Sequence, residues 1–281
     1  MSTELSFPPF DNVRLATLSD LPRIAMVAAA GFYHSPTFQF QRPYYADFPD
    51  DTLSSYWTEY QSAIRNPADV VLVAEDVWDP DEGLGVYGAL RGSSMYKFGS
   101  SPTADKVIVG VCSINLKPGS WRIGRFQTGN HVDSPTPATP FSTQNRDQCA
   151  MSLELYGAAT APAKAKYLAG RMRLSTLAVH PAYWRRGHAT RLVSWCIRLA
   201  DKDDVPVGIS AAPMGAAVAA KAGFEEQETV RIKRSTAQES VSQFGVPNVG
   251  DVELWVAIRQ PSRSPSDTST TCSDSPTGES L

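Results

Sequence analysis

The apolar positions of the chain follow two different periods, which predicts a domain built from both strands and helices. The run at 70–75 is almost continuously apolar, as is typical of a strand buried on both faces. After residue 187 the apolar residues instead form a broad stripe at helical spacing. The expected strands are 13–17, 70–75, 106–116, 171–179, 205–210, 226–234 and 251–258, and the expected helices are about 20–31, 50–65, 144–159, 187–201 and 214–222.

Segments that lack both periods divide the chain into three parts. Residues 1–10 form an irregular lead-in, residues 11–259 form one domain, and the Ser/Thr/Pro-rich stretch 260–281 is expected to be disordered. Within the domain, the polar stretches at about 76–105 and 117–160 are expected to be insertions.

The most informative stretch is 174–193, in which an apolar strand is followed by a proline turn, a basic loop with one glycine, and a helix. The first amides of a helix have no intrahelical partner and lie at the positive end of its dipole. A pyrophosphate accepts such amides well, and Gly187 lacks the side chain that would block its approach. Arg185 and Arg186 add positive charge at the same place. The stretch therefore predicts an anion site, with Gly187 at its centre.

Two motifs resemble the GNAT (Gcn5-related) N-acetyltransferases, as found in fungal-type members. The first resembles the acetyl-coenzyme A loop [Q/R]-x-x-G-x-[G/A]: Gly187 and Ala189 match, whereas Trp184 stands at the first position. The second is 209–224, in which a strand leads into Pro213, a helix and a closing Gly-Phe pair. The resemblance implies an α/β (α+β) fold, a mixed and mostly antiparallel twisted sheet of about six to seven strands flanked by helices.

The resemblance also implies where acetyl-coenzyme A lies. Strands 171–179 and 205–210 are expected to splay apart, so that pantetheine adds to the free edge of the first strand as an extended peptide does. The pyrophosphate is expected on the amides of the loop. The implied coenzyme-binding residues are Leu177, Ala178, Val179, Arg185, Arg186, Gly187, His188, Ala189 and Thr190. As a side chain, His188 is expected to face solvent.

The chemistry implied is attack of a primary amine, from a small molecule or a peptide, on the acetyl thioester in a ternary complex. The amide of Val179 is the candidate oxyanion donor, and the candidate bases are Glu75, at a strand end, and His34, among aromatic residues. Many family members carry a tyrosine acid four residues before the closing Gly-Phe; here that position is Ala219. This departure leaves two alternatives open, a coenzyme A-binding relative without turnover and an interaction protein.

Composition and residue spacing further limit the kinds of partner that are expected. The net charge of −3 over 281 residues gives no indication of a nucleic-acid surface. The four cysteines and four histidines have no metal-ligand spacing, so no metal is expected, and a reducing, cytoplasmic setting fits. No apolar run approaches the ~20 residues that cross a bilayer, so no membrane partner is expected. The oligomeric state is left open, with a homodimer among the options.

Overall fold

The protein is described by a computed structural model over residues 7–99, 105–127, 144–233 and 251–262. The first six residues of the expected lead-in and the expected tail from residue 263 lie outside the described residues, as do parts of both expected insertions. Seven strands form one sheet in the order β1-β2-β3-β4-β5-β7-β6. All neighbouring strands are antiparallel except β4 and β5, which are parallel. The expectation of a mixed, mostly antiparallel sheet is confirmed.

The elements have the following bounds. The strands are β1 (Val13–Leu15), β2 (Asp69–Val77), β3 (Lys106–Asn115), β4 (Met172–Val179), β5 (Val207–Ala211), β6 (Glu225–Ile232) and β7 (Val252–Arg259). The α-helices are α1 (Leu21–Phe32), α2 (Pro36–Gln41), α3 (Pro49–Arg65), α4 (Gly88–Gly92), α5 (Ser94–Gly99), α6 (Ala150–Leu168), α7 (His188–Lys202) and α8 (Pro213–Lys221). Single 3-10 turns are η1 (Leu18–Asp20), η2 (Glu82–Gly85) and η3 (Pro181–Tyr183).

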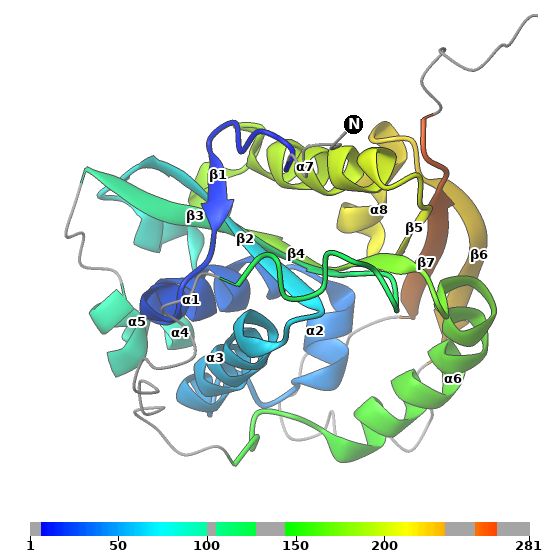
Figure 1. Cartoon of the computed structure of the whole chain (residues 1–281). Coiled ribbons are helices and arrows are strands. Elements are labelled where there is room, and N and C mark those ends of the chain that lie inside the picture. Colours follow the sequence, from blue (N-terminus) through cyan, green and yellow to red (C-terminus); the bar gives the residue numbers. More distant parts are fainter. Residues whose placement is uncertain (1–6, 100–104, 128–143, 234–250, 263–281) are drawn as a thin grey trace, which may run out of the picture.

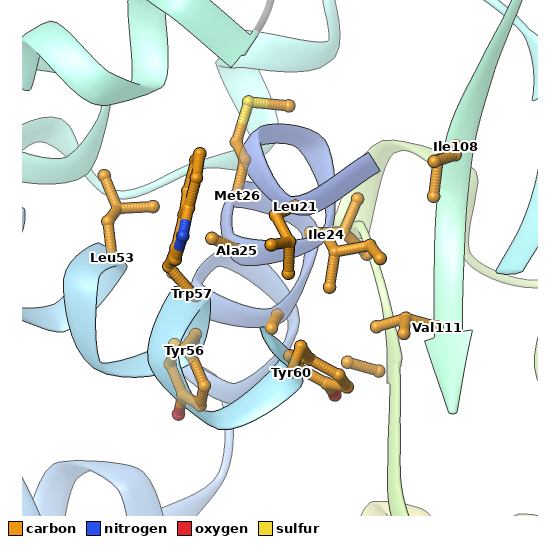
Figure 2. Close-up of a cluster of buried hydrophobic side chains, with 14 of the residues drawn as sticks. Leu21, Ile24, Ala25, Met26, Leu53, Tyr56, Trp57, Tyr60, Ile108 and Val111 are labelled. Atoms are coloured by element: carbon orange, nitrogen blue, oxygen red, sulfur yellow. The ribbon is translucent and has the colours of Figure 1, made fainter. Parts of the chain in front are cut away.

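Helices cover both faces of the sheet, and each face has its own apolar core (Figure 1). On one face, α1 lies between the sheet and α3, so its apolar residues are buried almost without a break. Figure 2 shows the side chains of Trp57 and Tyr60 of α3 directed toward α1, with Trp57 beside Ala25 and Tyr60 nearer to Val111 of β3. On the other face, the apolar stripe expected for the helix after Gly187 packs against the sheet through Leu192 and its neighbours.

The parallel pairing of β4 and β5 is short, and this opens the sheet. Their register runs from Met172 beside Val207 to Leu174 beside Ile209 and goes no further. Strand β4 continues to Val179, paired only with β3. The C-terminal half of β4 therefore presents a free edge, as the family resemblance implied.

Two differences from the expected elements have physical causes. The helix expected at 144–159 is α6, which begins later and runs through Pro162 to Leu168. Its last turn is held because Leu168 packs directly over Gly208, where an added Cβ would lie 2.6 Å from the Leu168 side chain. The short helices α2, α4 and α5 lack the length that gives a clear periodic signal.

Candidate active site

Val179 presents its backbone polar groups to the opening between β4 and β5. It pairs with Gly110, and the flanking hydrogen bond runs from the His180 amide to the Val109 carbonyl at 2.8 Å. In an antiparallel ladder this makes Val179 and Gly110 a non-hydrogen-bonded pair, so the N–H and C=O of Val179 point away from β3. The same alternation directs the groups of Leu177 toward the opening. The Val179 carbonyl accepts a hydrogen bond from the Trp184 indole at 2.7 Å, which leaves the amide facing the opening.

A cavity of about 600 Å³ occupies this opening. One wall is the segment 174–179 of β4, and the opposite wall is 209–212 with the start of α8. The α7 end of the cavity includes Gly187 and Thr190, and the other end includes Phe32, the last residue of α1, and Ser35, which follows that helix. Of the residues implied to bind coenzyme A, all but one line this cavity: Leu177, Ala178, Val179, Arg185, Gly187, His188, Ala189 and Thr190.

The α7 end of the cavity has the geometry of an anion site. Gly187 is the N-cap of α7 and adopts a left-handed conformation with φ of 86°, and Arg185 just before it has φ of 62°. The first amide to bond within the helix is that of Arg191, which donates to the Gly187 carbonyl at 3.0 Å. The amides of the three residues between them are thus the unpaired N–H groups of the helix start. Gly187, as the N-cap, has no side chain that could cap them.

Arg186 and His188 do not behave as expected from the sequence. The Arg186 guanidinium turns away from the cavity, to within 3.3 Å of Asp79 and 3.7 Å of Asp76. His188 was expected to face solvent, and this is wrong: it is buried, with Nε2 2.9 Å from Asp76. Burial lowers the pKa of His188, against the opposing effect of the Asp76 carboxylate. Asp76, near the end of β2, and Asp79, just after it, thereby bind two side chains of the loop.

A buried polar cluster supports the turn between β4 and the loop. Arg23 of α1 forms a bidentate pair with Glu82 at 2.6 and 2.7 Å, and the Tyr183 hydroxyl donates to the same carboxylate at 2.9 Å. Burial favours the protonated form of Glu82, but the bonds from Arg23 outweigh it and the pKa is lowered. His180 is fully buried beside this cluster, and its Nδ1 accepts the Ala182 amide at 3.4 Å. This cluster holds the residues that precede Gly187 in a fixed position.

The two candidate bases lie in different surroundings. His34 is exposed and is not one of the cavity-lining residues, but its ring lies 4.8 Å from the ring of Trp184, which does line the cavity, in an edge-on contact. Partial burial lowers its pKa. Glu75 binds Arg14 of the edge strand β1 at 2.8 Å and is not one of the cavity-lining residues. The geometry favours His34 of the two.

Two residues of the site gave no clear signal in the sequence. Gly31 lies under β4, and a Cβ there would approach the Val179 carbonyl oxygen to 2.8 Å. Its role is close approach of the helix to the strand, whereas a glycine near a helix end is usually a C-cap signal. Thr176 lines the cavity and binds Tyr60 of α3 at 3.1 Å. Both depend on contacts between segments distant in sequence.

The position of the usual tyrosine is closed to the cavity. Ala219 lies on the core-facing side of α8 and is 1% exposed, while its neighbour Val218 lines the cavity. Within the described ranges, no group of three or more His, Cys, Asp or Glu residues is arranged to hold a metal ion. Among the same residues, no helix is both long and apolar enough to cross a membrane.

The site is a groove beside a split parallel strand pair, and the groove ends on bare helix amides. An extended, phosphate-bearing ligand would fit this shape. The model of the acetyltransferase (GNAT) family matches residues 153–220. An acetyltransferase of the fungus Stachybotrys chartarum is 31% identical over 247 residues, which cover 88% of each chain. The chain belongs to the GNAT family of acetyltransferases, as its two motifs indicate.

Solved structures with similarity to this chain include other acetyltransferases. A Corynebacterium glutamicum protein described as histone acetyltransferase HPA2 and related acetyltransferase is 16% identical, with a TM-score of 0.48, covering 90% of this chain and 98% of its own. A putative arylalkylamine N-acetyltransferase 7 from Aedes aegypti is 12% identical, with a TM-score of 0.48, covering 88% and 86%.

Proposed function

We propose that this acetyltransferase moves the acetyl group of acetyl-coenzyme A to a primary amine by direct attack within one ternary complex. The observation that carries the proposal is the free edge of β4, whose cleft-facing groups at Leu177 and Val179 lead to the bare amides after Gly187. A single extended ligand can contact both features, because one continuous cavity joins them.

The cavity fits each part of acetyl-coenzyme A. Amides of His188, Ala189 and Thr190 would receive the pyrophosphate, with Arg185 at the same end. The backbone of Leu177 and Val179 would pair with the amide groups of pantetheine. Because Arg186 is held by Asp76 and Asp79, it contributes less to the anion site than the sequence implied.

Acyl transfer requires an oxyanion donor and a proton acceptor at the thioester. The Val179 amide faces the opening and would stabilise the negative charge that develops on the carbonyl oxygen. His34 would accept the proton from the attacking amine, since its lowered pKa keeps the imidazole neutral near pH 7. The carbon–sulfur bond then breaks and the thiolate leaves. Ala219 supplies no proton, but a thiolate is a good leaving group and can take its proton from water.

Calorimetric titration with acetyl-coenzyme A tests the binding part. Gly187→Asp places a side chain and a negative charge at the anion site, in a backbone conformation that strains any non-glycine residue. Gly119→Asp is a matched control, because Gly119 has φ of 76° and, like Gly187, no atom within 4 Å of an added Cβ. We expect micromolar binding by the wild type and Gly119→Asp, and its loss in Gly187→Asp.

An amine screen with detection of free thiol tests the transfer part. Amine-dependent thiol release by the wild type supports the proposal. Tight binding of acetyl-coenzyme A without release across a broad set of small amines and peptides would instead favour a coenzyme A-binding relative without turnover, consistent with the buried Ala219. Absence of binding would refute the proposed function altogether.

A further inference from the structure

Three hydroxyl groups connect helix α3 to strand β4 beside the cavity. The Tyr60 phenol donates to Thr176 Oγ1 at 3.1 Å, and Thr176 Oγ1 lies 2.7 Å from Ser113 Oγ of β3. The Ser113 amide also donates to Thr176 Oγ1, at 3.1 Å. Tyr60 and Ser113 are buried, at 0% and 6% exposure, whereas Thr176 lines the cavity. The hydrogen-bonded hydroxyls thus connect the core beneath α3 to the wall of the cavity.

The hydrogen-bonding capacity of Thr176 is fully used inside the protein. A threonine hydroxyl has two acceptor lone pairs and one hydrogen. The Tyr60 hydroxyl and the Ser113 amide take the lone pairs, so the Thr176 hydrogen points to Ser113 Oγ. Burial raises the pKa of Tyr60 well above its ordinary value, which keeps the phenol protonated and able to donate. Thr176 Oγ1 therefore serves the structure of β4 and has no remaining capacity to bind a ligand.

The three hydroxyls meet where β4 is least restrained. Ser113 pairs with Thr176, but the next residue of β3, Ile114, pairs with Leu174, which leaves Ser175 as an extra, unpaired residue in β4. Such a bulge interrupts the ladder on one edge of the strand. On the other edge, pairing with β5 ends at the same Leu174. Ladder bonds alone hold this segment weakly on both sides.

We propose that Tyr60, Thr176 and Ser113 form a hydroxyl clamp that fixes the bulged segment of β4 and so orients the cleft-facing backbone groups of Leu177 and Val179 for acyl transfer. This inference rests on the proposed function. Tyr60 and Thr176 are positioning residues in this view, because they act on the thioester only through the strand. Losing the clamp lowers kcat more than it changes affinity for acetyl-coenzyme A, since the anion site on α7 lies at the far end of the cavity.

Paired variants test the clamp. Tyr60→Phe and Thr176→Val each remove one hydroxyl with little change of shape, and Thr176→Ser keeps the hydroxyl. Tyr96→Phe is the matched control, because Tyr96 is also a buried phenol of the same core and its hydroxyl has no hydrogen-bond partner among the described residues. We expect kcat to fall about tenfold in Tyr60→Phe and Thr176→Val, the factor that one lost hydrogen bond produces. Thr176→Ser should restore kcat, and Tyr96→Phe should leave it unchanged.

Amide hydrogen exchange of 173–178 gives a second measurement that needs no turnover. Exchange should quicken there in Tyr60→Phe and Thr176→Val, and stay as in the wild type at 70–74 of β2. Unchanged kcat together with unchanged exchange would overturn the clamp, as would an equal loss of acetyl-coenzyme A affinity and kcat. If the wild type turns over no amine, the proposed function fails, and normal exchange in both variants would then refute the clamp independently.

Discussion

His180 makes the stability of this protein depend on pH in a direction that the structure fixes. The side chain is fully buried at the turn between β4 and the phosphate-binding loop. Burial lowers its pKa to about 4, because the cost of burying the charged ring outweighs the favourable field of Glu82, and Arg23 lowers the pKa further. The folded protein therefore holds a neutral imidazole at pH values where an unfolded chain already binds a proton.

The expected loss of stability follows from these two pKa values. Above pH 6.5, the pKa of an unfolded histidine, the ring is neutral in both states and its contribution is fully present. Below pH 6.5 only the unfolded chain takes up the proton, so the free energy of unfolding falls until the pH reaches about 4. The pKa difference of about 2.5, at about 1.4 kcal/mol for each pKa unit, amounts to between about 3 and 4 kcal/mol in full. Roughly 3 kcal/mol of this is lost by pH 4, where half of the folded molecules have bound the proton.

Urea unfolding of the wild type and His180→Asn between pH 7 and pH 4 measures this contribution. Asparagine is a favourable N-cap and can still accept the Ala182 amide that His180 Nδ1 accepts, but it does not titrate. The loss of the ring shifts the variant's stability by an amount that does not depend on pH. We expect the free energy of unfolding of the wild type to fall more steeply, by roughly 3 kcal/mol over this range. Parallel curves for the two proteins would refute the reasoning.

Two further changes test the site itself. Gly31→Ala places a methyl group 2.8 Å from the Val179 carbonyl oxygen, so α1 and β4 must separate. Calorimetry should show an affinity for acetyl-coenzyme A that is at least about tenfold weaker. Gly157→Ala is the control and should leave this affinity unchanged, because no described atom lies within 4 Å of the added Cβ. If His34 is the base, His34→Gln lowers kcat by at least about a hundredfold. The wild-type rate should decline only below pH 6.5, because the pKa of His34 is lowered, and this decline should be absent in the variant. A kcat profile of the variant that keeps this decline would exclude His34 as the base.

The sequence predicted those parts of the site that depend on local chemistry. A glycine between a basic loop and an amphipathic stripe predicted the helix start at Gly187 and the bare amides that follow it, whereas the left-handed conformation of Gly187 is a finding of the structure. Periodicity predicted β4, β5 and their neighbours to within a few residues. These features follow from backbone preferences and apolar spacing, which the sequence contains directly.

The parts that were missed depend on contacts between distant segments. His188 is buried because Asp76, which is 112 positions earlier, reaches its Nε2. Arg186 binds Asp79 across a similar separation. The sequence near residue 188 gives no signal of either contact, and the two aspartates belong to a polar stretch that resembles an ordinary loop. The same holds for Tyr60 and Thr176, whose hydroxyls meet only after α3 packs on the sheet.

These contacts change the account of how the loop recognises an anion. The paired arginines suggested that formal charge does most of the binding, but Arg186 is held by two aspartates and its charge is largely compensated. Trp184, which replaces the usual Gln or Arg, donates to the Val179 carbonyl and so links the loop to the strand that would hold the thioester. Recognition then rests on amides aimed by the left-handed Arg185 and Gly187. At this end of the cavity, the placement of the amides therefore contributes more to anion binding than formal charge does. Contacts with Asp76, Glu82 and Trp184 maintain that placement.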